Sequence, residues 1–183
     1  ENDPDTSSII INSDVLDAKV VGHYQFSNLL HSFKKLASHY LPSLLRDTVP
    51  QIDTVDDNNF EFQFAFKNIN PIIKFFTPEY HLSNNSYFAG SYNPSEMSVV
   101  LAGESPKIGI KGNELENFNI IAYTDSSHTE ITGISSKLRF NNNMFLENLN
   151  LQASIARDEV QMNLQWNNHA YPKYQGQFNF LTN

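Results

Sequence analysis

The histidines are the residues best suited to bind a metal ion, but they lie far apart along the chain. His31 and His39 stand eight residues apart in a segment whose spacing predicts a helix, too far along its axis to share one ion. The other four are each isolated in sequence: His23, His81, His128 and His169. No spacing typical of a zinc site occurs. We therefore expect solvated surface histidines and no metal.

Carboxylates that could catalyse hydrolysis occur as close pairs: Asp14 with Asp17, Asp56 with Asp57, and Glu114 with Glu116. Acid–base hydrolysis requires two carboxyl groups whose environments push their pKa values apart. Each pair lies in or beside a polar turn, away from the aromatic strand ends that would line a sugar cleft. The chain has no Gly-x-Ser-x-Gly elbow, no glycine-rich phosphate loop and no cysteine. We expect no catalytic residue and no cofactor, and we place a hydrolase last among the hypotheses.

The composition argues against several partners. The 183 residues carry a formal net charge of −8, with a pI of about 5.1. Nucleic acid and anionic membrane surfaces are both disfavoured, because each attracts basic patches. No run approaches the roughly 18 apolar residues of a membrane span. Residues 1–4 (ENDP) resemble neither a signal peptide nor an initiator methionine, so we expect a removed leader or a piece of a longer chain.

Apolar and polar side chains alternate in two runs within residues 149–166. Such alternation predicts strands with one apolar face, and the polar break between the runs predicts an antiparallel hairpin. A turn centred on Arg157 and Asp158 fixes the register. It places these residues opposite one another: Leu149 and Trp166, Leu151 and Leu164, Ala153 and Met162, Ile155 and Val160. The other face of the hairpin carries Asn, Gln and Ser.

The same alternation predicts strands along most of the chain. It is clearest in residues 59–67, where Phe60, Phe62, Phe64 and Phe66 share one face. Further strands are expected over 8–12, 16–26, several segments of 88–140, and 174–180, which contains Phe178 and Phe180. The short connections predict one domain over residues 1–183, an antiparallel meander.

The period changes where helices are expected. Residues 28–41 place apolar side chains at three-to-four spacing, which predicts an amphipathic helix near the start of the chain. Asn70 and Pro71 predict an N-cap followed by proline at the first helical position. The short apolar helix that follows could plug the end of an apolar space. Leu115 is out of phase with the strand residues that follow it, which predicts a β-bulge.

Three glycines, Gly22, Gly90 and Gly176, each begin a Gly-x-aromatic stretch, at separations of 68 and 86 residues. A glycine beside an aromatic residue lets a neighbouring ring lie over the bare backbone. The pattern is either chance or the trace of a repeat architecture whose units bury their faces by stacking. The unequal spacing weakens the second interpretation, and the sequence leaves both open.

The apolar stripe on the predicted strands has two interpretations. It is either the core of an ordinary β-sandwich or the lining of a groove that accommodates acyl chains. The uniformly polar opposite face favours the groove, because only one side of the sheet is apolar. The meander favours it as well, because successive antiparallel strands can curl into a trough.

Three stretches resemble one protein family: INSDVLDAKVVGHYQFSNLLHSFKKLASHYLPSL, FAFKNINPIIKFFTPEYHLSNNSYFAGSYN and LENLNLQASIARDEVQMNLQWNNHAYPKYQGQFNF. They are similar to the large TamB (translocation and assembly module) proteins of Bacteroidetes-like bacteria, over nearly the whole chain from Ile9 to Phe180. The resemblance implies an AsmA-like bridge protein, anchored in the inner membrane by an N-terminal helix and crossing the periplasm. Its repeats would form a β-taco, a long curled sheet with an apolar interior. Such proteins are implicated in phospholipid passage to the outer membrane and in assembly of outer-membrane proteins.

The leading hypothesis is therefore a middle segment of such a bridge. We expect a mainly β fold, an antiparallel meander curled into a β-taco, half-pipe or open sandwich, with the early helix as a lid and a short helical plug. Its partners would be phospholipid acyl chains and outer-membrane assembly machinery or a client protein. The groove-lining candidates are Phe60, Phe62, Phe64, Phe66, Leu149, Leu151, Ile155, Val160, Met162, Leu164, Trp166, Phe178 and Phe180. The alternative is a closed β-sandwich that binds a protein or glycan through its loops or a sheet edge.

Overall fold

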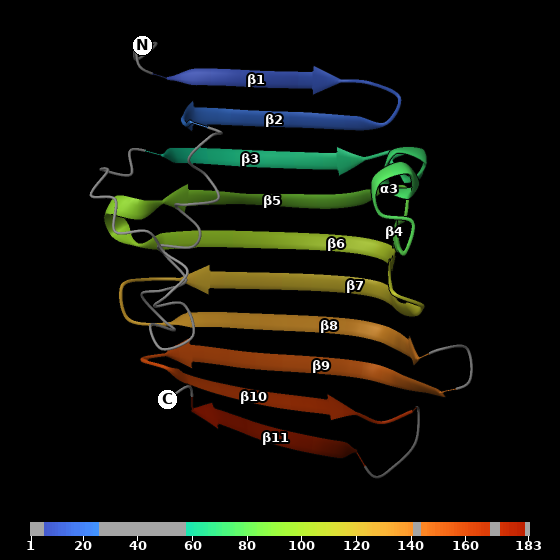
Figure 1. Ribbon diagram of the computed structural model, residues 1–183. Coiled ribbons are helices and arrows are strands. Elements are labelled where there is room, and N and C mark those ends of the chain that lie inside the picture. Colours follow the sequence, from blue (N-terminus) through green and yellow to red (C-terminus); the bar gives the residue numbers. More distant parts are fainter. Residues whose placement is uncertain (1–5, 26–57, 141–143, 169–172, 182–183) are drawn as a thin grey trace.

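The computed structural model describes residues 6–25, 58–140, 144–168 and 173–181, which form one antiparallel sheet of eleven strands (Figure 1). The strands are β1 (Ser7–Asn12), β2 (Leu16–His23), β3 (Asn59–Phe66), β4 (Tyr80–Leu82), β5 (Ser86–Asn93), β6 (Ser98–Ile110), β7 (Asn113–Thr124), β8 (Thr129–Phe140), β9 (Met144–Ala156), β10 (Glu159–Trp166) and β11 (Tyr174–Leu181). A helix, α3 (Asn70–Phe76), and a 3₁₀ turn, η1 (Pro94–Glu96), complete the described elements. The predicted helix over 28–41 lies outside the described residues, as do His31, His39, Asp56, Asp57 and His169.

The strands follow one another across the sheet in the order β1-β2-β3-β5-β6-β7-β8-β9-β10-β11, and β4 pairs with the far end of β6. This confirms the predicted antiparallel meander. Within the described residues β1 and β11 are edge strands that do not pair with each other, so the sheet is open. A closed two-sheet sandwich does not fit, because every described strand belongs to this one sheet.

The hairpin of β9 and β10 has the predicted register. Ile155 pairs with Val160, Ala153 with Met162, and Leu151 with Leu164. Arg157 and Asp158 at its tip have φ angles of 49° and 63°, as the tight turn of a two-residue hairpin requires.

The fourth predicted pair, Leu149 with Trp166, is not part of the ladder, which ends at Asn150 opposite Gln165. Beyond that point the amide of Asn167 donates to the carbonyl oxygen of Glu147 at 3.1 Å, which shifts the register by one residue. Trp166 pairs with β11 instead and stacks on Tyr174, with ring centroids 5.7 Å apart.

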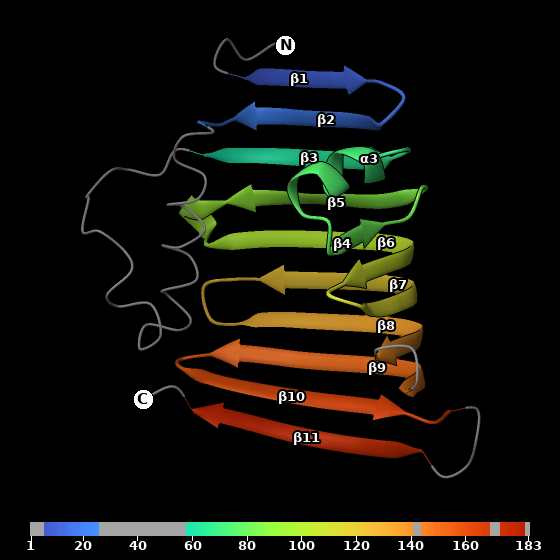
Figure 2. The same ribbon diagram turned by 45° about the vertical axis from the view of Figure 1, so that its right-hand side comes forward.

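Strands β6 to β9 bend along one line. Between β6 and β7 the ladder skips one pair, Pro106 with Asn117, and between β8 and β9 it skips Ser136 with Asn148. Between β7 and β8 it skips two pairs, Asn117 with Ser136 and Phe118 with Ser135. Asn117 and Asn148 adopt left-handed φ angles of 48° and 52°. The register is the same on both sides of the gap. The bulge predicted at Leu115 is therefore wrong, because a bulge places two residues opposite one, whereas here neighbouring strands turn together (Figure 2).

Serine hydroxyl groups replace the ladder hydrogen bonds that the bend removes. Ser135 Oγ donates to the carbonyl oxygen of Glu116 at 2.7 Å, and Ser105 Oγ lies 2.6 Å from Ser86 Oγ. These three serines are almost completely buried, with 4%, 2% and 0% of their surface exposed. They lie on the same face of the sheet as Phe60.

Helix α3 forms where its sequence predicts a short helix, but Asn70 is its first residue and not its N-cap. Ile69 occupies that position, and Asn70 hydrogen-bonds the backbone of Leu82 through both amide atoms, at 2.7 and 3.1 Å. Asn70 thereby ties the helix to β4. Phe75 and Phe76 are 83% and 74% exposed. The helix is present as predicted, but these two rings do not close an apolar space within the described residues.

Candidate functional site

The face of the sheet that carries Phe60, called here the apolar face, is crossed by unbroken rows of apolar side chains. The rows follow from the strand register, because cross-strand partners share a face. One row reads from β1 to β11: Ile9, Val20, Phe62, Gly90, Leu101, Ala122, Ile131, Ala153, Met162 and Phe178. Ten strands lie along this row. At about 4.8 Å per strand, it is about 43 Å long.

The predicted groove-lining residues all lie on this face, in two groups that the apolar rows connect. The first group is on β3: Phe60, Phe62, Phe64 and Phe66. The second is on β9, β10 and β11: Leu149, Leu151, Ile155, Val160, Met162, Leu164, Trp166, Phe178 and Phe180. Most of these side chains are half-buried. The stripe is therefore neither a sealed core nor a freely exposed surface.

The β3 end of the apolar face is packed as a core. Phe60 is 8% exposed and Tyr92 only 1%, and Val20 completes the buried cluster. The rings of Phe62 and Phe64 stack with centroids 5.3 Å apart, and Phe60 and Tyr92 lie 5.7 Å apart. These contacts fix the aromatic side chains of β3 against β2 and β5.

The β11 end of the same face is open. Phe178 and Phe180 are 42% and 51% exposed, although the stripe that includes them is continuous with the core. Their rings are nearly parallel, with an interplanar angle of 6° and centroids 6.4 Å apart. They form a flat apolar surface at the sheet edge.

Sequence reasoning missed the residues that join the two groups. Tyr92, Val99 and Leu101 were assigned to strands but not to the groove. At Gly90 a Cβ would lie 2.8 Å from Cζ of Phe62, so this ring lies over bare backbone, as the Gly-aromatic pattern suggests. The small residues between the aromatic strands could have indicated these positions. A continuous apolar row needs a small residue wherever an aromatic ring lies over the backbone of the next strand.

The opposite face, called here the polar face, is not uniformly polar, which corrects one argument for the groove. Val100, Ile121, Tyr123 and Ile134 lie on this face in β6 to β8, and all four are exposed. The expectation of a polar surface holds for β9 to β11 but not for the middle strands.

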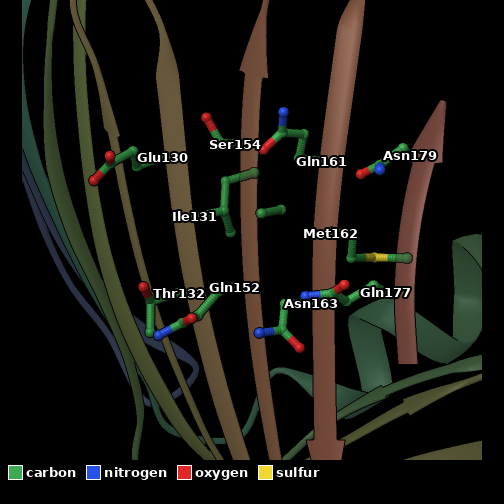
Figure 3. Close-up of a pocket in the computed structure, with 11 residues that line it drawn as sticks. Glu130, Ile131, Thr132, Gln152, Ser154, Gln161, Met162, Asn163, Gln177 and Asn179 are labelled. Carbon is green, nitrogen blue, oxygen red and sulfur yellow. The ribbon is translucent and has the colours of Figure 1, made fainter. Parts of the chain in front are cut away.

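A cavity lined by described residues opens on the polar face. It has a volume of about 540 Å³ and lies over β8 to β11 (Figure 3). Its walls are side chains such as Gln152, Gln161, Asn163 and Gln177. The sheet is thus hollowed on the side opposite the apolar stripe.

Three of the carboxylates considered for catalysis form ion pairs with basic side chains. Asp17 accepts a hydrogen bond from Lys67 at 2.7 Å, and Glu114 one from Lys107 at 3.0 Å. Arg139 Nε lies 2.8 Å from Glu116 Oε1, and this hydrogen bond lowers the pKa of Glu116 below its usual value. A lowered pKa makes Glu116 a poorer proton donor than an ordinary glutamic acid.

The part of the chain that the structure describes contains no cluster of three or more metal-ligating side chains. None of its helices has the length and hydropathy that a bilayer-spanning segment requires.

The fold and its surfaces define a class of protein: a single open antiparallel sheet with a continuous apolar stripe on one face and an amide-lined hollow on the other. The chain matches no family model, no curated protein and no solved structure. The resemblance to TamB proteins accordingly stays a prediction.

Proposed function

We propose that this chain is a non-enzymatic, periplasmic segment of a TamB-like bridge protein, and that its apolar face holds the acyl chains of phospholipids on their way to the outer membrane. In the same proposal, outer-membrane assembly machinery or a client protein is a further partner of the whole molecule.

The observation that carries the proposal is the unbroken row from Ile9 to Phe178. A core needs apolar residues only where a second layer covers them, whereas a path for a hydrocarbon chain needs them in every strand that the chain crosses. Here each of the ten strands contributes one apolar residue or glycine to the row. The partial exposure of Phe178 and Phe180 provides a point of contact at one end.

The energetics of such a contact come from water exclusion. Each methylene group that leaves water gains about 0.8 kcal/mol. A row of about 43 Å exceeds the roughly 30 Å thickness of the hydrocarbon core of a bilayer. A single acyl chain lying along it would therefore contact only part of its length, and several positions along the row would be nearly equivalent, as movement along the stripe requires.

Photocrosslinking tests the proposal directly. A benzophenone amino acid replaces Phe64 in one variant and Gln63 in the other. These neighbours on β3 lie on opposite faces, Phe64 half-buried on the apolar face and Gln63 exposed on the polar face. Irradiation with phosphatidylethanolamine vesicles should give a lipid adduct, seen by mass spectrometry, at Phe64 and not at Gln63. Equal adducts at both positions, or none at Phe64, would contradict the proposal.

A charge placed on the stripe provides the second test. Phe178→Asp should reduce the lipid that copurifies with the chain, because an ionised carboxylate is costly to bury beside an acyl chain. The matched control is Gln175→Asp, an exposed residue of the same strand on the polar face. The control should retain lipid. Undiminished lipid in Phe178→Asp would rule out this end of the stripe as a binding surface.

A further inference from the structure

The hollow on the polar face is built from two rows of polar side chains that cross four strands in register. One row is Glu130, Ser154, Gln161 and Asn179, and the other is Thr132, Gln152, Asn163 and Gln177. Between the two rows lie Ile131, Ala153 and Met162, whose side chains belong to the apolar face. The hollow spans three strand spacings, or about 14 Å, and Figure 3 shows the amide side chains of both rows on either side of Ile131 and Met162.

The chemistry of this lining is almost without charge. Primary amides dominate it, and each amide both donates and accepts hydrogen bonds. No Lys or Arg lines the hollow, and its one ionisable group is Glu130, at the β8 end, which lies 3.3 Å from Nε2 of His128. An anionic ligand would find no counter-charge here, and an acyl chain would leave the amides unpaired.

One of these amides has an oxygen that accepts no hydrogen bond from the described residues. Oδ1 of Asn163 is buried and has no hydrogen-bond partner among the described residues. A buried acceptor without a donor destabilises a protein by about 1–3 kcal/mol. The neighbours of Asn163 across the strands are Gln152 and Gln177, so a ligand group that donates to Oδ1 would lie between two further amides.

We infer that the hollow is a binding site for a neutral oligosaccharide. Sugar hydroxyl groups donate and accept in the same way as the amides, and one such hydroxyl would supply the donor that Asn163 Oδ1 lacks. Tyr123, 45% exposed, is the register partner of Glu130 and extends the site with an aromatic ring against which the C–H face of a sugar can pack. The volume of about 540 Å³ is within the usual range for ligand sites.

This inference goes beyond the proposed lipid function, and it concerns the opposite face of the sheet. Failure of either one therefore leaves the other intact. The competing occupant is a second copy of this chain, since amide-lined faces also stack on one another. A second copy would bury the same amides without any sugar.

Nuclear magnetic resonance titration of the full chain tests the inference, with cellohexaose, maltohexaose and mannohexaose as neutral probes and hexagalacturonate as the anionic comparison. At least one neutral probe should shift the side-chain amide signals of Gln152, Asn163 and Gln177 saturably, while hexagalacturonate should not. The signal of Gln63, an exposed amide of the same face on β3, should stay in place. Absence of saturable shifts with all neutral probes would overturn the inference, as would shifts confined to residues outside the hollow.

Two variants separate binding from folding. Asn163→Leu removes the unpaired acceptor at similar volume, so it should weaken binding by about fivefold or more while leaving the protein as stable as, or more stable than, the wild type. Gln177→Ala, at an exposed position, should also weaken binding, and Gln63→Ala should not. Loss of stability together with binding in Asn163→Leu would indicate a structural role and contradict the inference. A dimer detected by sedimentation, and dissociated by Gln152→Lys, would assign the face to a second copy.

Discussion

The two ends of the apolar face should respond very differently to the same deletion. Phe60 is 8% exposed at the β3 end, and Phe180 is 51% exposed at the β11 end. Replacing each by alanine removes the same ring, so the difference in stability between the variants measures how much of each ring the folded protein covers. This comparison decides whether the open end of the stripe exists in solution.

The expected magnitudes follow from these exposures. A phenylalanine ring buries about 150–250 Å², worth about 4–6 kcal/mol at about 25 cal/mol per Å². Phe60 keeps nearly all of that burial and contacts Tyr92, so Phe60→Ala should cost about 3–5 kcal/mol, including the cavity that it leaves. Phe180 is about half covered and leaves no closed cavity, so Phe180→Ala should cost about 2–3 kcal/mol.

Urea unfolding gives both values, and the chain provides a convenient reporter. Trp166 is the single tryptophan and lies half-buried on β10, beside the open end. Its fluorescence should change together with the circular dichroism of the whole sheet if unfolding is two-state. Asn179→Ala, an exposed polar neighbour of Phe180, is the control and should stay within about 0.5 kcal/mol of wild type. If Phe180→Ala costs as much as Phe60→Ala, the β11 end is covered and the groove interpretation fails.

Two further predictions concern turns and bends. Asn117→Ala should destabilise the sheet by about 1–2 kcal/mol, because alanine disfavours the left-handed φ of 48°. Asn117→Gly should have nearly the stability of the wild type in the same urea assay, because glycine adopts this φ freely. Equal losses of stability in the two variants would contradict the bend. Hydrogen bonds from Ser127 and His128 lower the pKa of Asp125 from 3.8 to about 2. Its stabilising contribution is thus present above the usual pKa and lost as the pH falls from 3.8 toward 2. Carboxyl nuclear magnetic resonance should place the Asp125 midpoint near 2, and a midpoint near 3.8 would contradict the turn geometry.

Local alternation was sufficient to predict the strands and one hairpin. Residues 59–67 read as a strand because four phenylalanines occupy every second position, and no helix or turn tolerates that pattern as well. The tip at Arg157 and Asp158 was readable because the two flanking runs are symmetric about it. In both cases the deciding information lies within a few residues of the element itself.

The bend was not predictable in this way. A single strand in which Leu115 falls out of phase looks the same whether one residue is inserted or the strand turns. The two cases differ only in the register of the neighbouring strands, and here the register is unchanged on both sides of Asn117. Asn70 was misread for a similar reason, since its hydrogen-bond partner Leu82 lies twelve residues away and on another element.

The polar face was the largest omission. Gln152 and Asn163 were treated as the wet side of a hairpin, because alternation assigns every second residue to one face or the other and says nothing of curvature. The hollow and the unpaired oxygen of Asn163 arise only when four strands are placed side by side. A binding surface of this kind depends on the register and curvature of several strands, which cannot be read from the sequence of one strand.

The composition of the two edge strands, β1 and β11, bears on the proposed function. Natural edge strands are usually protected from pairing with other chains by charged residues, proline or bulges. β1 (SSIIIN) and β11 (YQGQFNFL) contain no charged residue and no proline. The apolar rows extend to both of these strands, where Ile11 and Phe180 on the apolar face are exposed. An edge of this composition is suited to accept a further strand, and each added strand would lengthen the apolar rows by one residue. That property is what a segment of a longer lipid-conducting sheet would require, and an ordinary closed domain has no use for it.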